Sequence, residues 1–445
     1  MELAGRRVAV FGCAKSGLAT IELLVRHGAV VTACDSKPLD QLPAAAALIG
    51  MLGVKFAIQG AEALEGVDLA VLSPGVRPDQ ELFEEAGARG LEVTGDVELA
   101  CHFLRGPILG ITGSNGKTTV TALAGHLLKE CGIPAQVGGN IGTQAVAAMI
   151  DSSREDQWNV LELSSFQTEM FRRTRVQIGV ALNVTPDHLD RHHTIDEYAA
   201  AKLNMFTGQE PGDFAVLNAE NEITRSWAAS VRGGVHWFNA GGPVERGFWL
   251  DGSTLMAGAK PWMPSSEIGL RGRHNLENVL AAGCACALAG AGPEAMRRAV
   301  ASFPGVEHRI EFVRTLSGVD YFNDSKATNV DATIKALESF DRGLWAILGG
   351  KDKDSDYRPL RDPLARRARA ALLIGAAADK IANQIEGAVH IEQCGDMASA
   401  VAHAHAYARP GDTVLLAPAC ASFDQFNSYE HRGQVFKRLV HALED

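Results

Sequence analysis

An apolar, strand-like run that breaks into a glycine turn and then a helix constrains the fold of this chain more than any other feature. Its parts, in chain order, are the run Pro107 to Thr112, the turn Gly113, Ser114, Asn115 and Gly116, and the helix opening Lys117, Thr118 and Thr119. Such a turn aims backbone N–H groups at a phosphate, while the lysine reaches the β- and γ-phosphates and the first threonine ligates Mg²⁺. Ile111 stands where the usual motif has its first glycine, and an ordinary strand–turn–helix connection is the alternative. The order of the parts favours an ATP site.

Strands alternate with helices along the whole chain of 445 residues, in three successive segments. That alternation is typical of α/β domains with a mostly parallel sheet. We therefore predict an α/β fold of three consecutive domains. They are a Rossmann-like domain over residues 1–94, a central P-loop ATPase-type domain over residues 95–305, and a second Rossmann-like domain over residues 306–445. Within the central domain, the glycine-rich stretch 233–272 is expected to be irregular.

The composition argues against several classes of protein. A formal net charge of −11 disfavours non-specific nucleic-acid binding. The sequence has no apolar run of about 18 residues, so no membrane insertion is expected, and its start does not read as a secretory signal. The eight cysteines are scattered without the spacing of a zinc site. We expect a monomeric cytoplasmic protein that acts on small molecules.

The first segment has the layout of a dinucleotide-binding βαβ unit. A strand at Arg7 to Phe11 runs into the turn Gly12 to Gly17, and Asp35 ends the second strand. Ala14 replaces the middle glycine of the usual fingerprint, which favours a single nucleotide, such as a uridine diphosphate group, over a redox cofactor. Ser73 follows a further strand, at a carboxyl end where such sheets bind ligands. A Rossmann-like unit without a ligand and an NAD-dependent dehydrogenase are the alternatives.

Three polar groups of the middle segment are candidates for a cation site. Glu162 ends the strand that begins at Trp158, and because a charge in an apolar run is costly unless paired, we favour a Mg²⁺ ligand over a surface carboxylate. His188 lies in the loop 187–192 after the next strand, where a cation or phosphate site and a solvated loop are equally consistent with the residues. Lys202 lies in a helical stretch that is poor in charge, and the residues alone indicate a surface lysine.

Three polar loops of the third segment each follow a predicted strand. They cover residues 323–329, 349–354 and 419–429. The carboxyl ends of parallel strands share one edge of a sheet, so the three loops can converge on one crevice. Their cations Lys326 and Lys353, with Arg309 before them, would suit phosphates and carboxylates there, although each alone could be a solvated charge.

Together these motifs resemble the Mur ligase family, ATP-dependent enzymes that form amide bonds in peptidoglycan synthesis. The resemblance covers essentially the whole chain and includes the stretch Ala419 to Phe426. It implies that ATP phosphorylates the carboxylate of UDP-N-acetylmuramoyl-L-alanine and that the amine of D-glutamate then attacks the acyl phosphate. Another ligase of the superfamily, such as UDP-N-acetylmuramate–L-alanine ligase or folylpolyglutamate synthase, is the alternative. An alternative from a different functional class is a regulatory switch that hydrolyses ATP without forming an amide.

The resemblance also implies a role for each matching residue. The residues that would bind ATP are Gly113, Ser114, Asn115, Gly116, Lys117, Thr118, Thr119, Asn278, Arg309 and Asp324. Those that would bind the UDP substrate are Ser16, Asp35, Ser36, Lys37, Ser73, Asn140 and His188. Those around D-glutamate would be Lys326, Thr328, Lys353, Ser422 and Tyr429. Two magnesium ions would be held by Thr118, Glu162, His188 and Lys202, the last as a carbamate. The catalytic residues would be Lys117, His188, Lys202 and Lys326.

Overall fold

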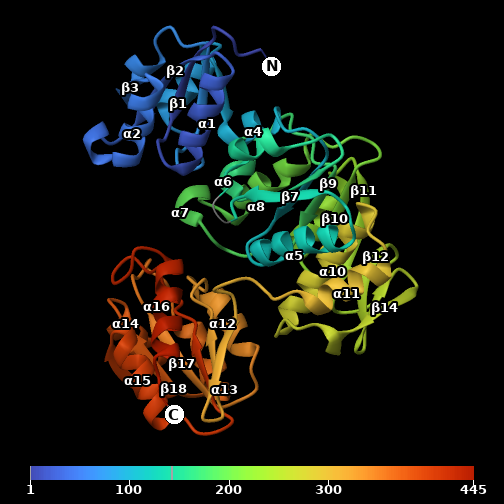
Figure 1. The fold of residues 1–445 in the computed structure, drawn as a ribbon, viewed down its shortest axis with the longest axis vertical. Coiled ribbons are helices and arrows are strands. Elements are labelled where there is room, and N and C mark those ends of the chain that lie inside the picture. The colour runs from blue at the N-terminus through green and yellow to red at the C-terminus, as the bar shows by residue number, and fades with distance from the viewer. Residues whose placement is uncertain (1, 142–143, 445) are drawn as a thin grey trace. The chain divides into compact units, whose positions relative to one another are not determined.

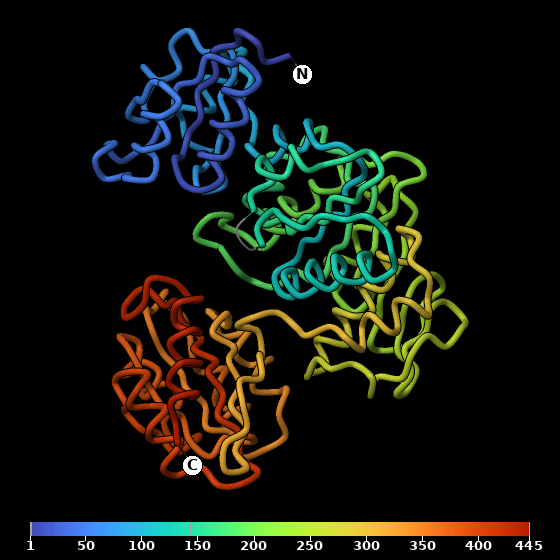
Figure 2. The backbone as a smooth tube through the Cα atoms, viewed as in Figure 1, coloured from blue at the N-terminus to red at the C-terminus, as the bar shows by residue number. Residues whose placement is uncertain are grey.

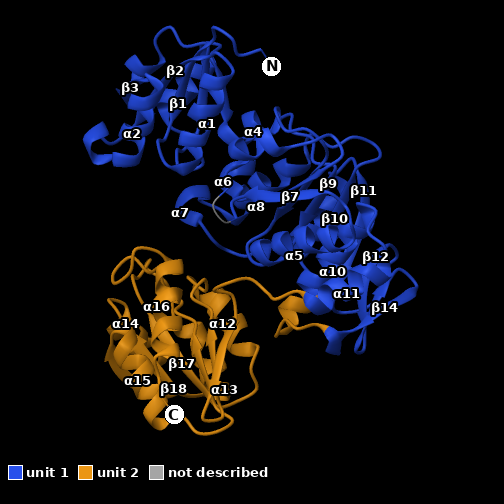
Figure 3. Ribbon diagram, in the orientation of Figure 1, with its two compact units in different colours: residues 1–267, 277–302 blue, residues 268–276, 303–445 orange. Residues whose placement is uncertain are grey.

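The computed structural model describes residues 2–141 and 144–444 and divides into two compact units. Unit 1 comprises residues 1–267 and 277–302, and unit 2 comprises residues 268–276 and 303–445 (Figure 3). Unit 1 holds two β-sheets and unit 2 holds one, and helices connect the strands of each (Figure 1). The course of the chain through these sheets can be followed by colour in Figure 2. The predicted α/β class with mostly parallel sheets is confirmed.

The N-terminal sheet of unit 1 has five strands in the order β3-β2-β1-β4-β5, and all of its pairs are parallel. The strands are β1 (Arg7–Phe11), β2 (Val30–Asp35), β3 (Lys55–Ile58), β4 (Leu69–Leu72) and β5 (Glu92–Gly95). The helices of this part are α1 (Lys15–Arg26), α2 (Pro43–Leu52) and α3 (Glu81–Ala88). Strands β1 and β4 are buried almost throughout, as expected of a parallel sheet that is covered on both faces.

The central sheet of unit 1 has nine strands in the order β14-β13-β12-β11-β10-β9-β6-β8-β7. They are β6 (Ile108–Thr112), β7 (Ala135–Gly139), β8 (Trp158–Glu162), β9 (Ile178–Ala181), β10 (Phe214–Asn218), β11 (Gly234–Asn239), β12 (Gly247–Asp251), β13 (Thr254–Ala257) and β14 (Lys260–Pro264). The helices are α4 (Asp96–Cys101), α5 (Lys117–Glu130), α6 (Ser165–Thr168), α7 (Leu189–His192), α8 (Ile195–Leu203), α9 (Glu222–Ser226), α10 (Arg273–Leu288) and α11 (Pro293–Ser302). Because β6 lies between β8 and β9, the loops that follow these three strands leave the same edge side by side.

The glycine-rich stretch 233–272 is not irregular, so that expectation was wrong. It contains β11 to β14, and the pairs β12–β13 and β13–β14 are antiparallel. Phe248 and Trp262 pack edge to face at 5.1 Å and bury this end of the sheet. The strands were hidden in the sequence because they are only four to six residues long and because glycine turns interrupt them, with Gly252 and Gly258 both at positive φ.

Unit 2 contains one six-stranded sheet in the order β15-β16-β20-β17-β18-β19, parallel except for the pair β15–β16. The strands are β15 (Glu311–Leu316), β16 (Val319–Asn323), β17 (Leu344–Gly349), β18 (Ala368–Ile374), β19 (His390–Gly395) and β20 (Thr413–Leu416). The helices are α12 (Val330–Glu338), α13 (Arg361–Arg367), α14 (Ala378–Ile385), α15 (Met397–Tyr407) and α16 (Tyr429–His441). An apolar core lies on each face of the sheet. None of the described helices in either unit is both long and apolar enough to span a membrane.

Candidate active site

The turn between β6 and α5 has the geometry of a phosphate-binding loop. Gly113 and Gly116 have φ of 151° and 87°, which residues with a side chain rarely adopt. The loop is held from the next strand, because the backbone N–H of Ser114 donates to the carbonyl of Asn183 at 2.8 Å. Lys117 folds back over the turn, and its Nζ donates to the carbonyls of Gly113 at 2.8 Å and Ser114 at 2.9 Å. A cation and the N-terminus of α5 therefore meet at one point, as anion binding requires.

Asn278 on α10 lies against this same loop. A Cβ atom built on Gly116 would come within 2.5 Å of Asn278 Oδ1, and the positive φ of Gly116 also disfavours a side chain there. The structure thereby brings Asn278 to the loop from more than 160 residues along the chain, and its adenine contact stays a prediction.

Glu162 supplies a buried carboxylate with one oxygen unused. Glu162 is the last residue of β8 and is 2% exposed. Oε1 accepts a hydrogen bond from Asn140 Nδ2 at 3.1 Å, whereas Oε2 has no hydrogen-bond partner among the described residues. A buried, unpaired carboxylate oxygen is costly, and a cation would remove that cost. The free oxygen of Glu162 therefore fits Mg²⁺, which binds carboxylate oxygens.

Lys202 is a buried lysine, so the sequence-based interpretation of a surface side chain was wrong. The residue is 1% exposed, and Nζ donates to the carbonyl of Gly113 at 3.0 Å and lies 4.4 Å from the ring centre of Tyr198. Burial lowers the pKa of Lys202 well below its ordinary value, and the charge of Lys117 adds to this effect. A lysine with a lowered pKa exposes a neutral amine, the form that reacts with CO₂.

His188 lies in the loop between β9 and α8, near the same cations. It has a left-handed backbone with φ of 53°, and its ring packs on Phe166 at 4.9 Å. Burial lowers its pKa, Asp187 opposes this, and Lys117 and Lys202 lower it further. The imidazole is therefore kept neutral, which is the form that binds a metal ion. His188 and the next two residues are exposed, so the cation or phosphate role of His188 stays a prediction.

A polar pocket of about 300 Å³ lies within unit 1, between the turn after β1 and the end of β7. The residues that line it include Lys15, Ser16, Pro74, Gly139, Asn140 and Gln167. Ser16 and Asn140, both expected to bind the UDP substrate, thus meet at one pocket. Ser73 lies beside the first turn, and its hydroxyl donates to the carbonyl of Gly12 at 3.0 Å.

The other residues expected at the UDP site lie at the end of β2. Asp35 accepts a hydrogen bond from the backbone N–H of Cys13 at 2.8 Å, which ties it to the turn after β1. Ser36 and Lys37 are exposed beyond it and do not line the pocket.

Asp96, at the start of α4, accepts a hydrogen bond from the Ser16 hydroxyl and is buried. Burial raises the pKa of Asp96 to about 7, and the Ser16 hydroxyl opposes the shift. A carboxyl group with a raised pKa in the folded state stabilises the fold fully below its unfolded pKa, near 4, and this contribution is lost as the pH rises through about 7. Between pH 5 and pH 8 this effect amounts to roughly 3 kcal/mol of unfolding free energy, and we expect Asp96→Asn to remove it and so to flatten the decrease in melting temperature over that range. Equal pH slopes for the two proteins in thermal melts would contradict this expectation.

In unit 2 the three polar loops follow β16, β20 and β17, which are neighbouring strands. Asp324, directly after β16, is buried with Oδ1 unpaired among the described residues, and burial raises its pKa to about 6 although Arg309 opposes the shift. The Nζ of Lys326 lies 5.4 Å from the ring centre of Tyr429, and Ser422 is buried on the loop after β20. These loops therefore place a cation and a carboxyl group near one another, which suits a ligand that carries both a carboxylate and an amine.

Two residues of the expected D-glutamate site are less enclosed. Thr328 is half-buried after β16, and Lys353 is exposed on the loop after β17. Among the described residues, Lys353 has no hydrogen bond or ion pair with the other four residues expected there.

Comparison with known proteins shows the family of the chain. Residues 6–95 match the Mur ligase MurD-like N-terminal domain, residues 111–286 the Mur ligase middle domain, and residues 308–420 the Mur ligase glutamate ligase domain. A UDP-N-acetylmuramoylalanine–D-glutamate ligase of Solibacter usitatus is 57% identical over 444 residues, which cover 100% of this chain and 99% of that protein. The chain belongs to the Mur ligase family. A ligase of the same name from Koribacter versatilis is 47% identical over 449 residues, with 100% of this chain and 99% of that protein covered.

Solved structures support the Mur ligase fold. The MurF ligase of Thermotoga maritima, determined in complex with ADP, aligns with a TM-score of 0.63 at 17% identity, over 99% of this chain and 96% of that one. At that identity the likeness shows the fold alone.

The structure of this Mur ligase also reveals a buried arginine that the sequence reading passed over. Arg432 on α16 is 0% exposed, and its guanidinium donates to the Ser325 hydroxyl and carbonyl at 3.0 and 2.8 Å. It also donates to the carbonyls of Cys420 and Ala421 at 3.1 and 3.2 Å. It thus ties the loop that carries Lys326 to the loop that carries Ser422. The sequence did contain a signal, because Arg432 falls on the same face of α16 as the apolar Phe436 and Val440.

We expect Arg432→Met to destabilise this Mur ligase, because three buried carbonyls would lose their donor. The expected loss is roughly 2–4 kcal/mol of unfolding free energy. Urea unfolding measures it, and Arg438→Met, at an exposed position of the same helix, is the matched control. Similar unfolding midpoints for the two variants would contradict the role given to Arg432.

Tyr198 was also missed. It lies four residues before Lys202 on α8, is buried, and its hydroxyl lies 3.2 Å from Ser114 Oγ. It therefore connects the helix of Lys202 to the phosphate loop. The spacing of four residues, which places both side chains on one face of a helix, was the signal in the sequence.

Proposed function

We propose that this protein is an ATP-dependent ligase that joins D-glutamate to UDP-N-acetylmuramoyl-L-alanine in peptidoglycan precursor synthesis. The observation that carries the proposal is the full-length identity of 57% to a ligase of that name, over a chain that also has the phosphate loop and the buried Glu162 and Lys202. Identity of this extent covers the substrate-binding parts as well as the nucleotide-binding part.

The chemistry begins with a carboxylate, which is a poor electrophile. The L-alanine carboxylate attacks the γ-phosphorus of ATP, an O–P bond forms, and ADP leaves. The uncharged amine of D-glutamate then attacks the acyl carbon, giving a tetrahedral intermediate that loses a proton and collapses to the amide and inorganic phosphate. Two anions must meet in the first step, so cations at the site lower its barrier.

The residues of unit 1 would carry the first step. Lys117 and the loop amides would bind the ATP phosphates, and Asn278 would contact the adenine. Thr118 and Glu162 would hold one magnesium ion, while His188 and the carbamate of Lys202 would hold a second. Bound magnesium would neutralise phosphate charge. The carbamate forms when the neutral Lys202 amine adds to CO₂ and releases a proton, and the low pKa of Lys202 supports it.

Substrate binding would be shared between the two units. Ser16 and Asn140 at the polar pocket, with Asp35, Ser36, Lys37, Ser73 and His188, would hold the UDP substrate. In unit 2, Arg309 and Asp324 would complete the nucleotide site. The D-glutamate would be bound by Lys326, Thr328, Lys353, Ser422 and Tyr429. We also propose domain boundaries near residues 94 and 305, a monomer, and a cytoplasmic location.

The test is an amino-acid competition with product detection. The protein is incubated with ATP, Mg²⁺ and UDP-N-acetylmuramoyl-L-alanine, and D-glutamate, L-glutamate or L-alanine is added in turn. We expect ADP release and a new amide product with D-glutamate alone. A product with L-alanine, or with L-glutamate at a similar rate, would support another ligase of the superfamily. Phosphate release without any amide product would support a nucleotide-hydrolysing switch.

A further inference from the structure

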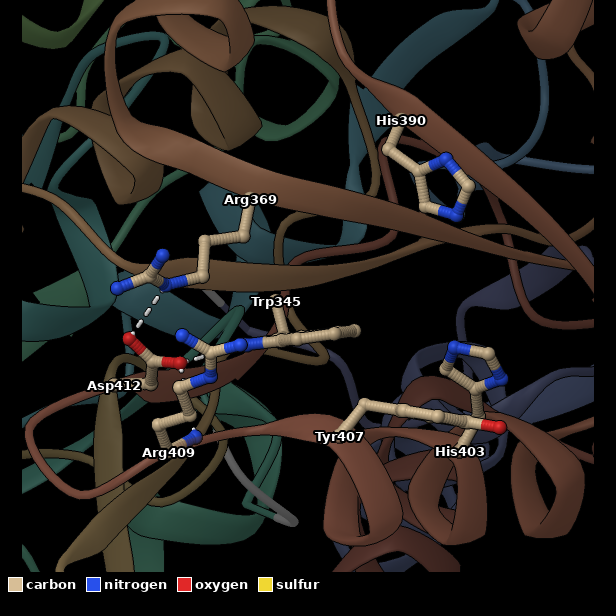
Figure 4. A pocket seen from close by; sticks show the side chains of 7 residues that line it. All are labelled: Trp345, Arg369, His390, His403, Tyr407, Arg409 and Asp412. Atoms are coloured by element: carbon tan, nitrogen blue, oxygen red, sulfur yellow. Dashed lines mark hydrogen bonds and ion pairs between the residues drawn. The ribbon is translucent and has the colours of Figure 1, made fainter.

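A second polar pocket lies in unit 2, at the edge where the parallel strands begin (Figure 4). Its volume is about 470 Å³, and it is lined by Trp345, Arg369, His390, His403, Tyr407, Arg409 and Asp412. Trp345, Arg369 and His390 stand at the starts of β17, β18 and β19. The loops of the proposed D-glutamate site leave the opposite edge, about 20 Å away along a six-residue strand. The pocket is therefore separate from that site.

The wall of this pocket is fixed by a buried carboxylate. Asp412 is 3% exposed and accepts hydrogen bonds from Trp345 Nε1 at 3.1 Å, Arg369 Nε at 2.7 Å and the backbone N–H of Arg409 at 3.0 Å. Figure 4 shows Asp412 between the two arginines. Burial acts to raise the pKa of Asp412, but these hydrogen bonds outweigh it and the pKa is lowered. The ionised Asp412 thus holds both the indole ring and the Arg369 guanidinium in place.

The pocket gathers positive charge on an acidic protein. The guanidinium of Arg409 has no hydrogen bond or ion pair in the part of the chain that the structure describes. A neighbouring hollow shares Arg369 and is lined also by Arg342, Arg366 and Arg367. The two hollows together are lined by five arginines and by Asp341 and Asp412, and Asp362 pairs with Arg366 at 3.9 Å. This leaves a charge of +2 in a chain whose net charge is −11. An excess of cations on one part of the surface attracts anions.

Aromatic rings stand beside these arginines. The rings of His403 and Tyr407 lie 4.6 Å apart, and those of Trp345 and His403 lie 6.0 Å apart. Tyr407 is 62% exposed, so its ring is open to a ligand. An exposed aromatic face next to arginine forks can stack on a flat ring while the forks bind its charged group.

We propose that this pocket binds a nucleoside phosphate, as a second nucleotide site distinct from the phosphate loop. Arginine pairs with phosphate oxygens in a two-pronged geometry, and Arg369 and Arg409 are available for that contact. The exposed ring of Tyr407, backed by His403, takes the base. The volume lies within the range of small-molecule sites. A simple inorganic anion would leave the aromatic wall without a role, which is why the pocket favours a phosphate that carries a ring.

The test measures the ¹⁹F NMR resonance of Trp345, in the wall of the pocket, in the full-length protein labelled with 5-fluorotryptophan. The chain has six tryptophans, and Trp345→Phe identifies the resonance of Trp345. AMP, inorganic phosphate and adenosine are titrated separately. We expect AMP to shift the Trp345 resonance saturably, phosphate to do so at least about tenfold more weakly, and adenosine to have no saturable effect.

Two variants and one control assign the shift to this pocket. Arg409→Gln and Tyr407→Ala change exposed side chains, and each should weaken AMP binding about tenfold. Arg438→Gln, on α16 and outside the pocket lining, should leave it unchanged. The proposal is overturned if AMP causes no saturable shift, if adenosine or phosphate binds as tightly as AMP, or if AMP binds the two pocket variants as it binds the control. Ligase turnover with D-glutamate is a separate measurement, so failure here would leave the proposed function standing.

Discussion

Lys117→Ala is expected to reduce kcat on the order of 10³-fold, because it removes the cation that folds over the phosphate loop. Lys117 Nζ lies within 3 Å of two loop carbonyls, so its charge is already placed where the terminal phosphates of ATP would arrive. The loop itself is held by Asn183 and by the geometry of Gly116, and the fold should survive the substitution. Steady-state kinetics with D-glutamate as acceptor measure the effect.

Lys129→Ala is the matched control for Lys117→Ala. It removes an exposed lysine from the other end of the same helix, α5, and should leave kcat within about twofold of the original. If Lys117→Ala retained similar activity to Lys129→Ala, the phosphate-binding role of the loop would be wrong.

Lys202→Ala should lower kcat by at least about 100-fold, since a metal ligand would be lost from the phosphate-transfer site. If the ligand is a carbamate, a short-chain carboxylate such as acetate or propionate can enter the space left by the side chain and supply the missing oxygens. We therefore expect partial recovery of activity in millimolar acetate. The measurement is kcat against carboxylate concentration for the variant and the original protein.

Lys202→Arg separates the carbamate from a plain positive charge. Arginine keeps the cation and much of the volume, but it does not form a carbamate, so this variant should be as inactive as Lys202→Ala and should not respond to acetate. A carbonyl signal that ¹³CO₂ adds to the original protein but not to this variant would complete the assignment. Full activity of Lys202→Arg would exclude the carbamate.

The parts of the fold that could be predicted are those with local signals. Buried parallel strands such as β1, β8 and β17 appear in the sequence as short apolar runs that end in glycine or polar loops. The strands β11 to β14 were not predicted, because short strands separated by glycine turns carry too little periodicity.

The site residues within a local sequence motif could be predicted. Those that depend on contacts between residues far apart in the chain could not. The loop at Lys117 has a local pattern, whereas the buried Nζ of Lys202 bonds to Gly113, which lies 89 residues away. Arg432 likewise bonds to Ser325, which lies 107 residues earlier. Such contacts exist only once the sheets have assembled, so the helical stretch around Lys202 could show that Tyr198 shares its face but not which loop the two contact. The resemblance to the Mur ligases named Lys202 as a site residue where the residues alone indicated the surface.

The most direct test of the acyl-phosphate mechanism follows the oxygen atoms of the substrate carboxylate. UDP-N-acetylmuramoyl-L-alanine is labelled with ¹⁸O in both oxygens of its terminal carboxylate and is turned over with ATP and D-glutamate, and the phosphorus products are examined by ³¹P NMR. If the carboxylate attacks the γ-phosphorus, one labelled oxygen must leave with inorganic phosphate, in a one-to-one ratio with the new amide. Label in AMP, or inorganic phosphate without label while the amide forms, would contradict the acyl phosphate on which the account rests.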